Sequence, residues 1–208
     1  VGKGEWDWQT IYRKEDGDAR ALMAIGEFEK KHSLCFGLGI GGKYVGHGVP
    51  LEPAKLLDGK WHLVCVTFDG KTIKFYADGQ EIGVSTKSTG SIDTQGEAPA
   101  YIGSDKGTRE FFKGGIDDVR IYNRAVSSGE IKTMALTDGK TAVDGLVGWW
   151  KLDGDLKNSA TQTVTGSVAQ FRGVDRKWKA APFSLAVARL DIRAAGEAAV
   201  RVTIRPID

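Results

Sequence analysis

The stretch WHLVCVTFDGKTIKFYADGQEIGVS, residues 61–85, decides the fold class. Residues 61–68 are mostly apolar and predict a β-strand, with His62, Val64, Val66 and Phe68 on one face and Leu63, Cys65 and Thr67 on the other. Asp-Gly pairs follow the alternating runs at residues 69–70 and 78–79. Asp-Gly between such runs favours a tight hairpin turn, because both residue types tolerate the positive φ angles that the turn requires. The stretch therefore predicts three antiparallel strands in succession.

The same alternation recurs along the rest of the chain. The other candidate strands are Gln9–Arg13, Ala21–Ile25, Ser33–Ile40, Ala100–Gly103, Gly115–Tyr122, Leu146–Leu152, Thr163–Phe171, Phe183–Ile192 and Ala198–Ile204. Only one short helix is predicted, over residues 131–136, where Ser127 supplies a cap and Glu130 an acidic residue in the first turn. The 28 glycines and five prolines are typical of short strands joined by glycine turns. We predict an all-β fold, an antiparallel two-sheet sandwich with one short helix.

Composition narrows the classes of function. The 208 residues carry a net charge of +2, which provides no broad basic field and argues against nucleic acid as a partner. Three histidines and two cysteines do not supply a four-ligand zinc site with the usual spacings. No apolar run reaches the length of a membrane span, so none is expected. Cys35 and Cys65 both interrupt strand-like runs, and they either pair in an oxidising compartment or act as two small buried hydrophobic residues.

Several segments are similar, in the same order, to laminin-G-like domains of the bacterial type. The matching segments are residues 61–70 (WHLVCVTFDG), 74–79 (KFYADG), 102–104 (IGS), 112–125 (FKGGIDDVRIYNRA) and 128–131 (SGEI). They resemble the central strand pair of the family, the hairpin after it, the closing strand and the short final helix. The resemblance covers most of residues 5–136. It implies a concanavalin A-like jelly roll made of two curved sheets.

The strand order departs from that family after residue 136. Residues 145–153 (GLVGWWKLD) resemble the family's first strand, yet here they follow the last one. In one interpretation, residues 1–208 form a single sandwich with circularly permuted strand order. It would consist of a main block (1–136), a linker (137–144) and the first-strand-like segment with its tail (145–208). In the alternative, residues 145–208 begin a second tandem copy. The main block alone would leave two sheet edges unpaired, which favours the single sandwich.

The resemblance implies a noncatalytic binding module of a larger secreted or cell-surface protein, extracellular or periplasmic. Its expected partners are a glycan or an extracellular protein, together with other domains of the parent protein. A glycan site needs exposed aromatic rings on which the C–H faces of sugars can stack. The candidate ligand-binding residues are Trp6, Trp8, Tyr44, Trp149 and Trp178. Trp61 and Trp150 match framework positions and are expected in the core, with Trp149 pointing away from Trp150.

Catalysis is not expected. On a strand Glu5 and Asp7 would point the same way, at a separation that two glycosidase carboxylates could use. Some β-glucanases of the same fold carry a further acid in this motif, but here residues 9–10 are Gln and Thr. His62 is expected on the apolar face of its strand, and His47 in an exposed loop. A polysaccharide-active hydrolase or lyase of the same fold stays open as an alternative, as does a structural spacer without a ligand.

Three aspartates form a candidate structural calcium site. Asp117 begins the closing strand, and Asp153 and Asp155 lie in the turn after the first-strand-like segment. The resemblance implies that these two strands are neighbours, and several relatives hold calcium there. Calcium prefers carboxylate and carbonyl oxygens, which this arrangement would provide. The alternative is that the three residues only form turns and accept backbone hydrogen bonds.

Overall fold

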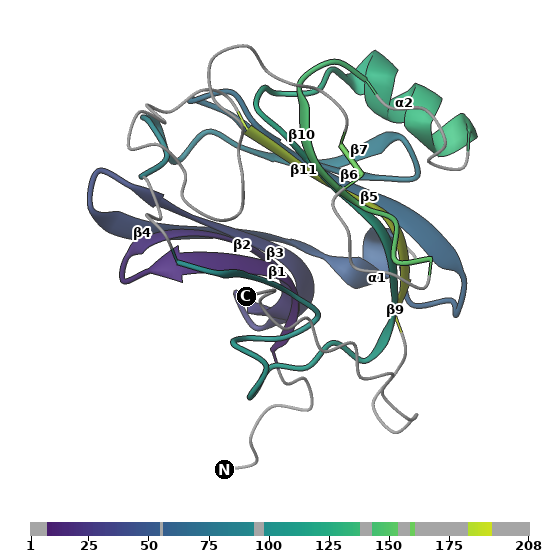
Figure 1. The fold of residues 1–208 in the computed structure, drawn as a ribbon, viewed down its shortest axis with the longest axis horizontal. Coiled ribbons are helices and arrows are strands. Elements are labelled where there is room, and N and C mark those ends of the chain that lie inside the picture. The colour runs from purple at the N-terminus through teal and green to yellow at the C-terminus, as the bar shows by residue number, and fades with distance from the viewer. Residues whose placement is uncertain are drawn as a thin grey trace.

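A computed structural model of the protein shows two antiparallel sheets stacked face to face (Figure 1). It describes residues 8–54, 56–93, 98–137, 143–153, 159–160 and 183–192. Within these ranges, sheet A has the order β4-β3-β2-β1-β8 and sheet B the order β10-β9-β11-β5-β6-β7. The strands are β1 (Gln9–Asp16), β2 (Ala19–Phe28), β3 (Lys31–Ile40), β4 (Lys43–Pro50), β5 (Trp61–Phe68), β6 (Ile73–Ala77), β7 (Gln80–Ser85), β8 (Ala100–Ile102), β9 (Gly114–Tyr122), β10 (Leu146–Trp150) and β11 (Phe183–Ile192). The helices are α1 (Leu51–Ala54) and α2 (Ser128–Leu136). The predicted two-sheet all-β class is confirmed.

Local sequence signals account for the best-predicted elements. Strand β5 has the predicted bounds, and Asp78 and Gly79 have φ angles of 49° and 81° in the hairpin turn between β6 and β7. The predicted cap of α2 is also present. The Ser127 hydroxyl accepts a hydrogen bond from the Glu130 backbone N–H at 3.3 Å, and the Glu130 carboxylate accepts one from the Ser127 N–H at 2.8 Å. This capping box satisfies two backbone donors at the start of the helix.

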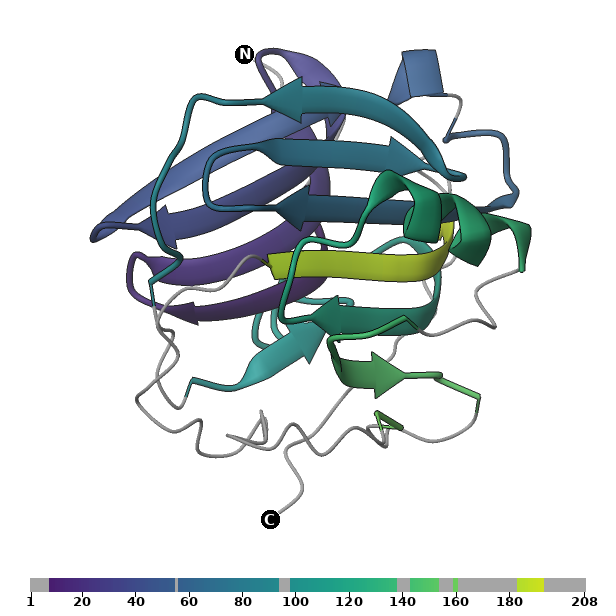
Figure 2. The ribbon, with the colours of Figure 1, turned by 90° about the horizontal axis from the view of Figure 1, so that it is seen from above.

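Apolar side chains pack in two layers. The main core lies between the sheets and includes Phe36 from β3 and Val66 from β5. A second cluster lies between α2 and the outer face of sheet B, where Met134 packs near Cys65 (Figure 2). Cys35 and Cys65 belong to different sheets, and both are buried free thiols. They therefore act as small buried hydrophobic residues, one of the two alternatives that the sequence left open.

Strand β4 was not predicted, because His47 between two glycines indicated an exposed loop. His47 is instead buried on the inner side of β4. Its ring nitrogens hydrogen-bond the hydroxyls of Ser85 (2.8 Å) and Ser88 (3.0 Å). These bonds join the β4 edge of sheet A to the β7 edge of sheet B. The glycines beside His47 face outward, so their lack of side chains does not weaken the core.

The C-terminal strands belong to sheet B. Strand β10 pairs with β9, as the resemblance implied, and β11 lies between β9 and β5 (Figure 2). Strand β11 has the predicted bounds, whereas the predicted strands at residues 163–171 and 198–204 lie outside the described residues. Strands from both sides of the 137–144 segment thus share one sheet. The choice between one permuted sandwich and a second tandem copy stays a prediction.

Two of the three tryptophans on the strands of sheet B lie on the predicted face, and the third does not. Trp150 lies in the core between the sheets, and Trp149 points to the opposite face, beside the cluster under α2. Trp61 was predicted in the core, and that prediction is wrong: 49% of its surface is exposed. Trp61 begins β5 on the outer face, outside the cluster that α2 covers, and its ring lies over Gly115.

His62 is buried at the start of β5, but its ring binds two carboxylates instead of packing in apolar surroundings. Its Nδ1 lies 2.8 Å from Oδ2 of Asp78, and its Nε2 lies 2.9 Å from Oδ1 of Asp58. The other carboxylate oxygen of Asp78 accepts a hydrogen bond from the Leu63 N–H at 2.9 Å. His62, Asp58 and Asp78 form a clamp that ties the segment before β5 to the turn between β6 and β7. The nearest further charge is Lys60, whose Nζ lies 3.3 Å from Asp58.

The clamp makes stability depend on pH. Burial lowers the pKa of His62, but the hydrogen bonds and charges of Asp78 and Asp58 outweigh it, and the pKa is raised above 6.5. The hydrogen bond from His62 lowers the pKa of Asp58 from 3.8 to about 2. The contribution of His62 is therefore complete below about pH 6.5 and is lost as the pH rises through its raised pKa. The contribution of Asp58 is present above about pH 4 and is lost as the pH falls toward 2.

We expect His62→Gln to lower the melting temperature most between about pH 4 and 6.5, where imidazolium and carboxylates are both charged. Above that range the difference from the wild-type protein should shrink, because the neutral imidazole can donate only one of its two hydrogen bonds. Thermal unfolding of both proteins over a series of pH values measures this difference. A difference that is constant with pH would contradict the ionic clamp.

Candidate functional site

The outer face of sheet A, the side turned away from the core, carries unusually small side chains. Most outward-facing residues of β2, β3 and β4 are small, although Leu22 and Phe28 of β2 also face outward. The register aligns Ala24, Cys35 and Gly48 across the three strands and pairs Gly37 with Gly46. The small residues are Ala24 and Gly26 on β2, Cys35 and Gly37 on β3, and Gly46 and Gly48 on β4. The result is a low floor on which larger side chains can lie.

Aromatic rings occupy this floor. A Cβ atom added to Gly26 would lie 2.6 Å from the Trp8 ring, and one added to Gly37 would overlap the Tyr44 hydroxyl oxygen. The glycines therefore allow both rings to rest against the backbone. Trp8 is 38% exposed and Tyr44 is 40% exposed, as predicted for ligand-contacting aromatic residues. The Arg20 guanidinium stacks on Tyr44, 4.7 Å from the ring centroid.

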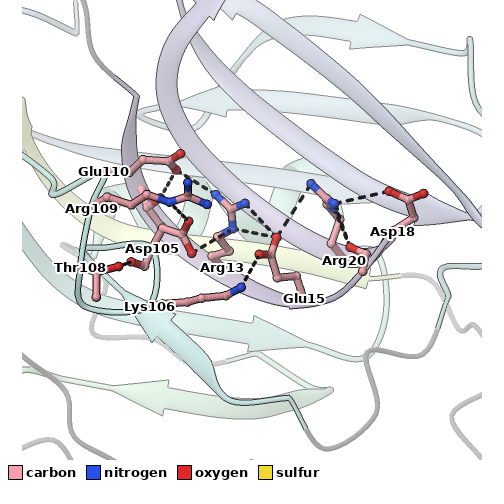
Figure 3. Close-up of polar contacts among 11 residues, drawn as sticks. Arg13, Glu15, Asp18, Arg20, Asp105, Lys106, Thr108, Arg109 and Glu110 are labelled. Atoms are coloured by element: carbon pink, nitrogen blue, oxygen red, sulfur yellow. Dashed lines mark hydrogen bonds and ion pairs between the residues drawn. The ribbon is translucent and has the colours of Figure 1, made fainter.

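An ionic network lies beside the aromatic rings, and the sequence did not predict it (Figure 3). At its centre, the Arg13 guanidinium on β1 contacts Glu15 and Glu110, both at 2.8 Å, and its Nε lies 3.5 Å from Asp105. We call this group the Arg13 network. Its members are Arg13, Glu15, Asp18, Arg20, Asp105, Lys106, Arg109 and Glu110. It joins the β1–β2 hairpin to the loop after β8.

The network lowers the pKa of Glu15. Partial burial raises that pKa, but hydrogen bonds and charges from Arg13, Lys106 and Arg20 outweigh the effect of burial. A general acid needs a raised pKa, so Glu15 is suited to holding Arg13 in place. Glu110 also positions Arg13, because its carboxylate accepts hydrogen bonds from Arg13 (2.8 Å) and from the Thr10 hydroxyl (3.1 Å).

Trp149 is occupied by neighbouring groups. The Arg120 guanidinium lies 4.4 Å from its ring centroid and the Lys151 ammonium 4.7 Å. Both cations therefore make cation–π contacts with the Trp149 ring. The indole N–H donates a hydrogen bond to Asp118. This leaves Trp149 less room to stack on a sugar than Trp8 has, although no observation tests its predicted role.

The predicted calcium residues are only partly described. Asp117 lies on β9, opposite Arg189 of β11, and Asp153 lies just beyond β10. Leu152 has a φ angle of 61°, so the chain leaves the extended conformation before Asp153. Asp155 lies outside the described residues. Among the residues that are described, no three or more His, Cys, Asp or Glu side chains gather as metal ligands would, and calcium stays a prediction.

Other predicted residues also fall outside the described ranges. These are the ligand candidates Trp6 and Trp178 and the acids Glu5 and Asp7. Of the five aromatic candidates, the structure therefore places three. Trp8 and Tyr44 share the outer face of sheet A, whereas Trp149 lies on the outer face of sheet B. A sequence signal for the Arg13 network did exist, because Arg13 and Glu15 alternate on one strand and Arg20 follows across the turn.

The fold and this face define an antiparallel β-sandwich that carries aromatic and ionic side chains on one sheet. The family model described as "Concanavalin A-like lectin/glucanases superfamily" matches residues 6–132. The chain belongs to this superfamily, as the resemblance to laminin-G-like domains predicted. Within the residues that the structure describes, no helix is long and apolar enough to cross a bilayer.

One solved structure has a weak similarity to this chain. The chain is similar to the crystal structure of an S-layer domain-containing protein from Clostridium thermocellum ATCC 27405, with 24% identity and a TM-score of 0.29. That match covers 65% of this chain and 66% of the other, and so low a TM-score carries no argument about function. The search of curated proteins gave no match.

Proposed function

We propose that the protein is a noncatalytic carbohydrate-binding module of a larger secreted or cell-surface protein, and that its ligand binds on the outer face of sheet A. The observation that carries the proposal is the pair of exposed rings, Trp8 and Tyr44, resting on a glycine floor beside charged hydrogen-bonding groups. Sugars need this combination, because their C–H faces stack on aromatic rings and their hydroxyls need polar partners. A superfamily that contains both lectins and glucanases supports a carbohydrate ligand.

The chemistry of the same face supports a binding role without catalysis. A retaining or inverting glycosidase needs one carboxyl group that is protonated and can donate its proton. Glu15 and Glu110 both pair with Arg13, and the pKa of Glu15 is lowered. This favours a positioning role for Glu15 over proton donation to a leaving group. The candidate acids of the alternative, a polysaccharide-active enzyme, are Glu5 and Asp7.

Binding of polysaccharides to the wild-type protein and to single variants tests the proposal. We expect Trp8→Ala and Tyr44→Ala each to raise Kd about tenfold, which corresponds to about 1.4 kcal/mol of lost contact. Trp61→Ala is the matched control, because Trp61 is also exposed (49%, against 38% for Trp8 and 40% for Tyr44) but lies on sheet B. An equal loss in Trp61→Ala, or no polysaccharide binding by the wild-type protein, would contradict the proposed face.

The same samples separate the remaining alternatives. Release of reducing ends that disappears in Glu5→Gln or Asp7→Asn would make the protein an enzyme. The predicted structural calcium is tested by measuring binding and melting temperature with a chelator and with added calcium.

A calcium ion that binds only the folded state raises the melting temperature. A melting temperature that is the same with chelator and with calcium would count against calcium on Asp117, Asp153 and Asp155.

A further inference from the structure

The Arg13 network holds four basic and four acidic side chains, and two of the bases are strongly exposed. The side chain of Lys106 is 55% exposed and that of Arg109 is 66% exposed. The acids with which these two bases pair lie deeper, since the side chain of Glu15 is 12% exposed and that of Asp105 is 0% exposed. The exposed charge of the loop after β8, which carries both bases (Figure 3), is therefore mainly positive.

The most exposed acid of the network is Asp18. Asp18 is exposed on the β1–β2 turn, where its carboxylate lies 3.4 Å from Arg20. Arg20 also donates to the backbone oxygen of Gly17 at 2.8 Å, so this ion pair is part of the turn. Asp18 therefore sits at the end of the hairpin, away from Lys106 and Arg109, which the loop after β8 carries.

The loop after β8 fixes the position of the two outer bases. The Asp105 N–H donates to the Arg109 oxygen at 2.9 Å, and the Thr108 N–H donates to the Asp105 oxygen at 3.1 Å. Lys106 reaches Glu15 at 3.2 Å, and Arg109 reaches Asp105 through its Nε at 2.7 Å. Each base thus uses some of its N–H donors to bind a buried acid, and its remaining N–H donors face solvent. Cations held in this way lose less conformational entropy when they bind an anion than free side chains would.

The network and the aromatic rings are neighbours on this face. The Thr10 N–H, two residues from Trp8, donates to the backbone oxygen of Glu110 at 2.8 Å, and Arg109 directly precedes Glu110. Arg20 of the network stacks on Tyr44, 4.7 Å from the ring centroid. One ligand on this face can therefore contact both the aromatic rings and the bases. We propose that the ligand is an anionic polysaccharide whose carboxylate or sulfate groups bind Lys106 and Arg109 while its rings stack on Trp8 and Tyr44. This inference rests on the proposed function and names the class of ligand for the same face.

Matched polymers that differ only in charge test the inference. The probes are polygalacturonate with its methyl-esterified form, and dextran sulfate with dextran. We expect the charged member of at least one pair to bind about tenfold or more tightly than its neutral counterpart, and this preference to fall as salt rises. The first pair reports carboxylate recognition and the second reports sulfate recognition.

Variants connect the preference to the loop. The double variant Lys106→Gln/Arg109→Gln should lose about tenfold or more in affinity for the charged polymer and nothing for the neutral one. The control, Lys71→Gln/Lys132→Gln, removes the same charge from exposed positions elsewhere and should bind like the wild-type protein. Unfolding curves of both variants establish that each is folded.

Each other outcome has a defined meaning. If neutral and charged polymers bind equally but binding still requires Trp8, the proposed function stands and the anionic class is wrong. If polyglutamate binds as tightly as the charged polysaccharides, the face selects charge alone and the polysaccharide class is wrong. If no polysaccharide binds, both the proposed function and this inference fail.

Discussion

Replacing Trp150 by alanine is expected to lower the free energy of unfolding by about 3–5 kcal/mol, the usual cost of removing a large aromatic side chain from a core. Trp150 is buried between the sheets and packs in the same cluster as residues of β1, β3 and β5. Its strand, β10, is hydrogen-bonded to β9. The indole therefore stabilises the sandwich formed by the main block, although it follows residue 144 in the chain.

This experiment also distinguishes the two domain interpretations. If residues 145–208 belong to the same sandwich, Trp150→Ala lowers the denaturant midpoint of the entire unfolding transition. If they begin a second copy, the main block unfolds at an unchanged midpoint. Lys151→Ala is the control, since the neighbouring side chain is exposed and its replacement should change stability by about 0.5 kcal/mol or less. A main-block transition insensitive to Trp150→Ala would end the single-sandwich interpretation.

Replacing Arg120 by leucine should have an effect of similar size, about 3–5 kcal/mol, because it breaks a buried ion pair. The Arg120 side chain is almost completely buried under α2, and its guanidinium lies 3.1 Å from the Asp118 carboxylate. It also stacks on Trp149. Leucine would leave the Asp118 carboxylate, which also accepts a hydrogen bond from the Trp149 indole, without its cation.

A double-mutant cycle separates this ionic effect from loss of packing. Asp118 has a φ angle of 59°, a conformation that asparagine tolerates, so Asp118→Asn removes the charge without straining the backbone. Arg120→Leu/Asp118→Asn should then recover part of the stability lost in Arg120→Leu. The control is Lys74→Gln, which breaks the exposed Lys74–Glu81 pair of the same sheet and should cost about 1 kcal/mol or less. Strictly additive single variants would show that Arg120 acts by packing alone.

Sequence patterns predicted a strand or helix correctly where that element depends mainly on its own residues. The alternation in residues 61–85 predicted β5 with its observed bounds and the Asp-Gly turns beside it. The Ser127 capping box predicted α2 for the same reason, since its partners lie three residues apart. For Trp8 and Tyr44, a loop-like context predicted exposure, and both rings are exposed.

Tertiary structure decided whatever depends on distant segments. Trp61 was expected in the core because it matches a framework position of the family, but only the position of α2 determines which part of the outer face of sheet B is covered. Strand β4 looked like a loop because of its glycines, yet they leave room for Tyr44 to lie across β3. The Arg13 network joins residues about ninety positions apart, and it exists because β8 pairs with β1. Alternation within a strand specifies which face a side chain takes, whereas strand order across the sheet specifies its neighbours. The sequence therefore carries a signal for Arg13 beside Glu15, but none for their contacts with Asp105 and Glu110.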